Sequence, residues 1–392
     1  MAGSVIVSGA RTPMGRLAGS LGSFRATDLG GFAIAAALER AGVSGDEVDY
    51  VYLGQVVQAG AGQVPARRAA VNGGISMSVP SNALNKACLS GINAIHLADQ
   101  MIQAGEADVV VAGGMESMSS APYLLPGARD GLRYGDATAH DALIHDGLFC
   151  AFDHCLMGAG TDRYAATADM AREPQDAYAA RSHERAARAQ KDGVLADEIV
   201  PVTVPQRRGD PIEVVDDEGI RPGTSAEALS RLAPAFSESG NITAGNASQL
   251  SDGACAVVVA SPQAAERLGV EPLGEIVSYG QVAGPDTNLL HQPSAAALQA
   301  LDRAGLSVGD VELFEINEAF AAVALASIED LGVPDDIVNV NGGAIALGHP
   351  IGMSGARLVL TLALELGRRG GGVGSASLCG GGGQGDALLL RV

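Results

Sequence analysis

Three side chains in this 392-residue sequence have the chemistry and the neighbours of catalytic groups: Cys88, His349 and Cys379. Cys88 lies in the segment NKACLSG, directly before an expected helix. A thiol at the start of a helix faces unpaired backbone N–H groups and the positive end of the helix dipole, and both favour the nucleophilic thiolate. The alternative is a buried and inert cysteine, because free cysteines are among the most buried residues in proteins.

An internal repeat relates the Cys88 segment to the segment that contains His349. The Ser-Gly pair at 90–91 recurs at 354–355, and an expected helix follows each pair. Two homologous halves would bring these helix starts together and place His349 beside Cys88. An imidazole beside a thiol activates a cysteine nucleophile. The alternative role for His349 is to cap or orient its loop.

Cys379 and Asn317 each lie at the end of an expected strand. Four glycines follow Cys379, and they let the backbone approach a ligand closely with its N–H groups pointing into a site. No Lys-Ser/Thr pair follows them, so the run is not a phosphate-binding P-loop. The side-chain amide of Asn317 could hold a water molecule or polarise a carbonyl group.

Short apolar runs alternate with amphipathic stretches along the chain, which indicates an α/β fold. The Val-rich character of the apolar runs favours strands of a sheet that is covered on both faces. The expected strands are 4–10, 48–54, 107–114, 255–261, 311–317, 337–343 and 372–380. The expected helices are 27–41, 91–104, 174–191, 294–304, 317–331 and 353–369.

The repeat also predicts the domain organisation. Residues 38–44 (LERAGVS) recur as residues 301–307 (LDRAGLS) at nearly the offset of the Ser-Gly pairs. The long stretch between the two halves contains more Pro, His, Asp and Arg and few clear strands, so it is expected to be a functional insertion. The predicted units are an N-terminal half of 1–118 plus 250–269, an inserted loop domain of 119–249 and a C-terminal half of 270–392.

Composition excludes several classes of function. The sequence has 45 acidic and 25 basic residues, a net charge of −20 that repels nucleic acid. We expect no membrane span, because no apolar stretch approaches the roughly 20 residues that crossing a bilayer requires. Five widely spaced cysteines, without a signal peptide or a peroxisomal address, indicate a reducing cytoplasm.

Cys255 is predicted to be a residue of the core. The spacing of four further residues fits no common zinc motif, so no metal is expected: His145, Cys150, His154 and Cys155.

Several long segments of the sequence together resemble the thiolase family, and in detail its bacterial acetyl-CoA acetyltransferases. These segments are ARTPMGR, NKACLSG, TAGNASQLSDGA, NEAF, NVNGGAIALGHPIGMSG and CGGGGQGD, in the family's order and spacing. The resemblance covers essentially the whole chain. It implies the thiolase fold, in which two homologous βαβ-type halves form a five-layer αβαβα arrangement with an inserted loop domain.

The resemblance also implies an activity and a role for each site residue. The activity is the reversible condensation of two acetyl-CoA molecules to acetoacetyl-CoA and CoA through an acylated Cys88. His349 would take the thiol proton, and Cys379 would be the second acid and base. Asn317 would position a water that forms one oxyanion hole with His349, and the N–H groups of Cys88 and Gly381 would form the other.

Binding of CoA is implied for residues in and around the insertion: Arg221, Ser248, Ala244, Phe236, Met157 and Phe320. No cofactor is implied, since CoA and acyl-CoA are substrates, and the family is usually a homotetramer built as a dimer of dimers. The chain departs from the pattern of many short-chain members at Leu156, where they carry His, and near residues 284–286. The departure at Leu156 bears on which acyl group is preferred.

Three alternatives share this fold. The first is a 3-ketoacyl-CoA thiolase for longer chains in fatty-acid β-oxidation. The second is a ketoacyl-synthase-type condensing enzyme, which would be expected to carry Cys-His-His, so Cys379 argues against it. The third is a non-enzymatic protein that binds acyl-CoA or lipid, which would be free to lose Cys88, His349 or Cys379.

Overall fold

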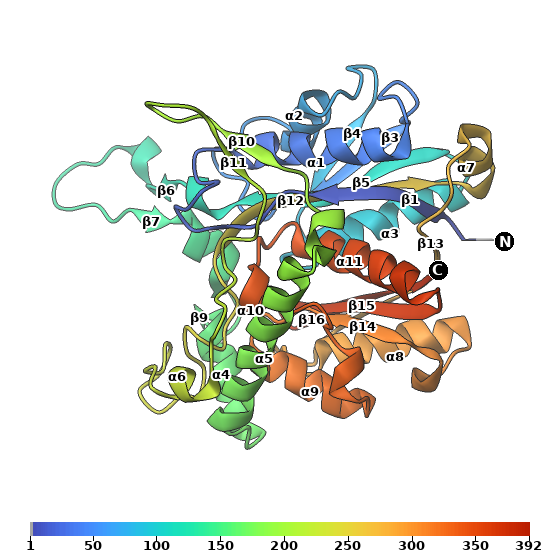
Figure 1. The fold of residues 1–392 in the computed structure, drawn as a ribbon. Helices are drawn as coiled ribbons and strands as arrows, with labels where there is room; N and C mark the ends of the chain where they lie inside the picture. Colours follow the sequence, from blue (N-terminus) through green and yellow to red (C-terminus); the bar gives the residue numbers. More distant parts are fainter. Residues whose placement is uncertain (1–2) are drawn as a thin grey trace.

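A computed structural model describes residues 3–392, and its main feature is a sheet of ten strands with helices on both sides (Figure 1). The sheet follows the order β14-β15-β16-β13-β1-β12-β5-β3-β4, and the short β2 (Gly15–Arg16) pairs with β12. The N-terminal half supplies β1 (Val5–Arg11), β3 (Tyr50–Gly54), β4 (Ser81–Leu84), β5 (Val109–Ser117) and β12 (Ser251–Ala260). The C-terminal half supplies β13 (Gly274–Ala283), β14 (Leu313–Ile316), β15 (Val373–Gly380) and β16 (Gln384–Arg391).

The helices divide into outer and central sets (Figure 1). Buried side chains of α1 pack with those of β1, β3, β5 and β12, whereas α8 packs with β14 and β16. Between the two halves, α3 and α11 form a shared core with strands from both. The outer helices are α1 (Ala26–Ala41), α2 (Pro65–Asn72), α7 (Pro262–Leu268), α8 (Gln292–Ala304) and α9 (Ala321–Leu331), and the central ones are α3 (Ser90–Gln103) and α11 (Ser354–Arg369).

The two central helices start side by side, as the repeat predicted. A Cβ atom on Gly91 would lie 2.7 Å from the backbone nitrogen of Ala356, and one on Gly355 would lie 2.5 Å from that of Ile92. Any larger side chain at either position would push the helices apart. The glycines therefore hold the segments that precede the two helices, with Cys88 and His349, close together.

The repeated heptapeptides form equivalent structures at the ends of α1 and α8. Each helix is capped by a glycine in the left-handed conformation, Gly42 with φ 64° and Gly305 with φ 67°. The arginine two residues before each cap donates to a strand carbonyl of its own half, that of Gly9 for Arg40 and that of Tyr279 for Arg303.

Residues 118–250 contain one helix of 20 residues, several shorter elements and a projecting arm. The arm carries β6 and β7 and extends away from the body of the molecule (Figure 1). A π-helix at Leu143–Leu148 follows it, a form that is rare and is frequent at functional sites. The remaining elements here are β6 (Tyr123–Leu124), β7 (His140–Asp141), β8 (Phe149–Cys150), β9 (Cys155–Leu156), α4 (Met157–Thr167), α5 (Arg172–Lys191), β10 (Val202–Val204), β11 (Ile212–Val214) and α6 (Ala226–Ser230).

Two element predictions were wrong. The helix expected over 317–331 begins only at Ala321, because its N-cap residue Phe320 has an extended backbone. The strand expected over 337–343 is a loop with one isolated parallel bridge, between Val338 and Phe314, and the side chain of Asn339 adds two hydrogen bonds to the backbone of Ile316. Its Oδ1 accepts from the N–H of Ile316 at 2.8 Å and its Nδ2 donates to the carbonyl of Ile316 at 2.8 Å. Within 3–392, no helix is both long and apolar enough to cross a membrane.

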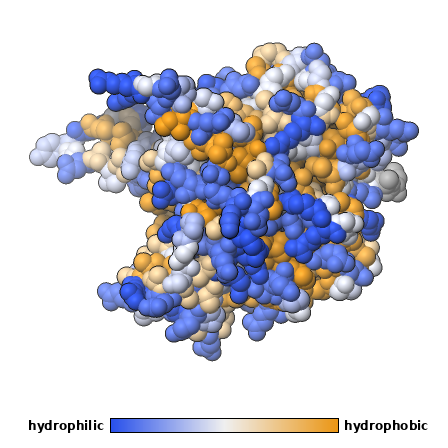
Figure 2. Space-filling view, viewed as in Figure 1, coloured by the Kyte–Doolittle hydropathy of each residue, from blue (hydrophilic) through white to orange (hydrophobic). Residues whose placement is uncertain are grey.

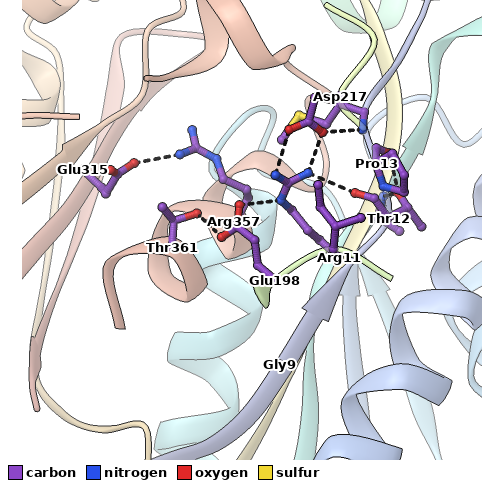
Figure 3. A network of polar contacts seen from close by, with 12 residues as sticks. Gly9, Arg11, Thr12, Pro13, Glu198, Asp217, Glu315, Arg357 and Thr361 are labelled. Carbon is purple, nitrogen blue, oxygen red and sulfur yellow. Dashed lines mark hydrogen bonds and ion pairs between the residues drawn. The ribbon is translucent and has the colours of Figure 1, made fainter. Parts of the chain in front are cut away.

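A buried network of charged groups joins the insertion to both halves (Figure 3). Arg11 on β1 donates to Glu198 at 2.7 Å and to both carboxylate oxygens of Asp217 at 2.7 and 2.9 Å. Thr361 on α11 also donates to Glu198, at 2.7 Å. Nearby on α11, Arg357 pairs with Glu315 at 2.7 Å. This network fixes the insertion against β1 and against the helix that follows His349.

Candidate active site

Cys88, His349 and Cys379 line one pocket of about 70 Å³. They come from the turn before α3, the loop before α11 and the end of β15. The wall of the pocket is mostly apolar. The other lining residues are Ala87, Gly147, Leu148, Met157, Ser248, Leu289, Ala319, Phe320, Ile351, Gly380 and Gly381.

Cys88 is half-buried on a tight turn one residue before the N-cap of α3. We predicted that the helix start stabilises its thiolate, and for the free protein this prediction was wrong. Burial raises the pKa of the Cys88 thiol to about 12, and the opposing effect of a backbone N–H is smaller. The nucleophile is therefore a neutral thiol at rest and needs a base.

His349 is a buried, neutral imidazole with one nitrogen available as a base. Burial and the positive charge of Arg357 lower its pKa to about 3. The hydroxyl of Ser354 donates to the Pro350 carbonyl at 2.9 Å, so it accepts from Nδ1 of His349 at 2.6 Å. The proton is thus assigned to Nδ1, which leaves the lone pair of Nε2 free.

Asn317 lies next to the free nitrogen of His349. Its Nδ2 is 3.4 Å from His349 Nε2, and its buried Oδ1 has no hydrogen-bond partner among residues 3–392. A buried amide oxygen without a protein partner is a typical site for a bound water. The adjacent Glu318 accepts from Tyr178, Ser182 and the backbone of Ile345, and so holds the loop that leads to His349.

Cys379 is buried at the end of β15, and its glycine loop packs against the Cys88 turn. A Cβ atom on Gly380 would lie 2.5 Å from Cγ of Leu89, and one on Gly381 would lie 3.5 Å from Cβ of Ala87. Burial raises the pKa of the Cys379 thiol, and the nearby Cys88 raises it further. Both cysteines are therefore protonated in the free protein.

The residues predicted to bind CoA divide into two groups. Met157, Ser248 and Phe320 line the pocket. Phe236 packs edge-on against Phe320, with 6.3 Å between ring centroids. The other two lie outside the pocket lining on the surface: Arg221, whose backbone N–H donates to Nδ1 of His183 at 3.2 Å, and Ala244.

Three further residues have roles that sequence reasoning missed. Ser354 orients His349, and in the sequence only its place in the repeat distinguishes Ser354 from other serines. Glu116 accepts from the N–H groups of Val56, Val57 and Gly352, and burial raises its pKa to about 7. Glu318 lies in the segment NEAF, and the sequence alone did not predict a role for it. An acidic residue within or beside an apolar run is the signal that could have identified both glutamates.

The four residues considered as zinc ligands are not gathered into a site. Over residues 3–392 there is no group of three or more His, Cys, Asp or Glu side chains placed to hold a metal ion. Cys150 and Cys155 face each other across β8 and β9, while His145 pairs with Asp146. Cys255 is fully buried in the core, as predicted.

Comparison with known proteins places the chain in a family. Residues 4–263 match the family model "Thiolase, N-terminal domain" and residues 270–392 match "Thiolase, C-terminal domain". A "Probable acetyl-CoA acetyltransferase" of Mycolicibacterium smegmatis is 59% identical over 99% of this chain and 100% of its own length. Proteins of Mycobacterium tuberculosis (58%; 100% of both chains), under the same name, and Cupriavidus necator (49%; 99% and 98%), named "Acetyl-CoA acetyltransferase", are similar. The chain belongs to the thiolase family.

Proposed function

We propose that this protein is an acetyl-CoA C-acetyltransferase, which reversibly condenses two acetyl-CoA molecules to acetoacetyl-CoA and CoA. The observation that carries the proposal is that Cys88, His349 and Cys379 line one small, mostly apolar pocket. The names of the full-length relatives support the same activity.

In the first half-reaction, Nε2 of His349 takes the proton of the Cys88 thiol while the sulfur attacks the thioester carbonyl. The bond from the carbonyl to the CoA sulfur breaks, and protonated His349 gives its proton to the leaving thiolate. Acetyl-Cys88 and free CoA result, and His349 is neutral again. The raised pKa of each thiol fits this order, because neither needs to be ionised before substrate binds.

In the second half-reaction, Cys379 gives its proton to His349, and the resulting Cys379 thiolate removes a proton from the methyl group of a second acetyl-CoA. The carbanion attacks acetyl-Cys88, a carbon–carbon bond forms, and His349 returns its proton to the departing Cys88 sulfur. The N–H groups of Cys88 and Gly381 would form one oxyanion hole, and His349 with a water on Asn317 the other.

We assign CoA binding to the rim of this pocket. Met157, Ser248 and Phe320 would line the pantetheine path, with Phe236 and Ala244 beyond them. The exposed Arg221 would provide a cation for the nucleotide phosphates of an otherwise acidic protein. No further cofactor is required.

The walls of the pocket favour short acyl groups over the long-chain alternative. Leu148, Leu289 and Ile351 bound the pocket, and a long acyl chain would require these side chains to move. The presence of Cys88, His349 and Cys379 in one pocket favours an enzyme over a non-catalytic acyl-CoA-binding or lipid-binding protein.

We further infer a five-layer αβαβα architecture, a homotetramer and a cytoplasmic location. The placement of α3 and α11 between the two halves supports the layers (Figure 1). The projecting arm exposes large hydrophobic side chains that a second copy could cover: Tyr123, Leu125, Leu132 and Tyr134. Figure 2 shows hydrophobic surface on part of this arm, at the left of the view. A reducing compartment suits a protein whose five cysteines are all free.

The test is mass spectrometry of the protein after incubation with acetyl-CoA. We expect one acetyl adduct on the Cys88 peptide of the wild type and none in Cys88→Ala, which should still bind CoA. Cys379→Ala should accept the acetyl group but form no acetoacetyl-CoA. Full turnover by Cys88→Ala would contradict the proposal.

A further inference from the structure

The turn that carries Cys88 adopts a backbone conformation that is unfavourable for its sequence. Ala87 has a φ of 51°, in the left-handed region that residues with a Cβ atom rarely adopt. Ser90 supports the turn on one side, because its hydroxyl accepts from the N–H of Lys86 at 2.8 Å and donates to the carbonyl of Ala87. Such a conformation persists only where the surrounding structure holds it.

A second support lies behind the turn, outside the pocket lining. The ammonium of Lys86 contacts both carboxylate oxygens of Asp386 at 2.8 Å. The Asp386 side chain is fully buried and that of Lys86 is 22% exposed. Lys86 is not among the residues that line the pocket.

Asp386 is also directly linked to the strand that carries the second thiol. In the pairing of β15 with β16, Asp386 lies opposite Leu378, and its neighbour Gly385 lies opposite Cys379. The ion pair therefore connects Lys86, two positions before Cys88, to Asp386 on β16, the strand paired with the strand of Cys379. Burial raises the pKa of Asp386, and the ammonium of Lys86 acts in the opposite direction.

Two aromatic rings complete the base of this cluster. Tyr279 on β13 is stacked on His96 of α3, with 3.8 Å between centroids and 2° between planes. Its hydroxyl is 3.5 Å from Nδ2 of Asn93 and interacts with the Asp386 carboxylate. Asp386 is thus held by β16, β13 and Lys86, which makes it a rigid anchor for the turn.

We propose that Lys86 and Asp386 are positioning residues, whose ion pair holds the Cys88 turn against the Cys379 strand and sets the spacing of the two thiols. This inference rests on the proposed function. Lys86 does not line the pocket, so its contribution reaches the substrate only through the nucleophile. A displacement of about 1 Å at a reacting atom can slow a reaction on the order of a hundredfold.

The experiment measures the single-turnover rate of Cys88 acetylation at saturating acetyl-CoA, together with the thermal unfolding midpoint. Lys86→Met leaves the carboxylate of Asp386 buried and unpaired, so it should lower both the midpoint and the rate. Asp386→Asn leaves Lys86 free to reach water, so the protein should fold, with a rate lowered about tenfold to a hundredfold. Lys86→Arg should retain most of the rate, and KM for acetyl-CoA should change little in every variant.

The decisive variant is the double replacement Lys86→Met/Asp386→Asn. It removes the unpaired buried charge, so the unfolding midpoint should recover relative to Lys86→Met while acetylation stays slow. Arg181→Met, which breaks the pair of Arg181 on α5 with Asp335, is the control and should acetylate at the wild-type rate.

Recovery of both the midpoint and the acetylation rate in the double variant would overturn the inference, since the pair would then contribute only to stability. A wild-type protein that forms no acetyl adduct would overturn the proposed function and this inference with it. If the wild type is acetylated and Asp386→Asn is acetylated at the same rate, this inference is overturned while the proposed function stands.

Discussion

The hydroxyl of Ser354 lies 2.6 Å from Nδ1 of His349 and donates its own proton to the carbonyl of Pro350. This relationship assigns the imidazole proton to Nδ1 and leaves Nε2, which lies 3.4 Å from Nδ2 of Asn317, as the unprotonated nitrogen. Since Ser354 is in the first turn of α11, the helix itself orients the proposed base.

Ser354→Ala should lower kcat with little change in KM, because the imidazole loses the acceptor that selects its tautomer. We expect about a tenfold effect, a fraction of the 10²–10⁴ that a positioned base contributes. Steady-state kinetics of acetoacetyl-CoA cleavage would measure it. Ser327→Ala, which removes another buried hydroxyl, is the control, and equal losses in the two variants would argue against a role for the Ser354 hydroxyl.

Alkylation of Cys88 in the free protein should accelerate steadily with pH. Because burial raises the pKa of this thiol to about 12, the thiolate fraction should grow about tenfold per pH unit between pH 7 and 10. Iodoacetamide labelling of the Cys88 peptide, followed by mass spectrometry, would measure the rate. A plateau with a midpoint near pH 7 would show instead a thiolate stabilised by the helix start.

Leu148→Ala should shift the acyl preference toward longer chains. Removing this side chain from the pocket wall makes room for additional methylene groups, each worth about tenfold or more in discrimination. The ratio of kcat/KM for six-carbon to four-carbon ketoacyl-CoA should rise about tenfold. Leu298→Ala, on the surface of α8, should leave the ratio unchanged, and no shift in Leu148→Ala would remove this residue from the acyl site.

Arg11→Met should destabilise the protein strongly. It leaves the carboxylates of Glu198 and Asp217 buried without their cation, which costs about 3–5 kcal/mol. Denaturant unfolding followed by circular dichroism would measure the loss. The exposed pair of Arg231 with Glu227 gives the comparison, because Arg231→Met should change the free energy of unfolding by less than about 1 kcal/mol. Similar losses in both variants would contradict this account.

Acid should destabilise the fold partly through His183. Burial and the nearby Arg221 lower its pKa to about 4, whereas in the unfolded chain the value is near 6.5. Between these values the unfolded state binds more protons, so the free energy of unfolding falls as pH falls from about 6.5 to about 4. His183→Gln should weaken this dependence of the thermal midpoint. His140→Gln, at an exposed position, should leave this dependence unchanged. Parallel plots of thermal midpoint against pH for His183→Gln and the wild type would contradict the prediction.

The sequence by itself determined part of the fold and named the members of the candidate site. Apolar runs located six of the ten strands of the large sheet, since a buried strand must carry apolar residues, but β13 and β16 were not expected. The repeat predicted that the starts of α3 and α11 meet, and Gly91 and Gly355 show why they can. The motifs named Cys88, His349 and Cys379, which line one pocket.

Tertiary structure decided the protonation states and the supports of that site. The pKa of Cys88 depends on burial by segments far away in the chain, which outweighs the local helix start that the sequence displays. Lys86 pairs with Asp386, and Arg11 pairs with both Glu198 and Asp217. No local sequence pattern predicts these pairs, because the partners are far apart in the chain and only folding brings them together. The segment 337–343 was predicted to be a strand and is a loop, because its structure also depends on contacts that are distant in the sequence. Its β-like composition is a local property, whereas the hydrogen bonds of Asn339 to Ile316 exist only once β14 is in place.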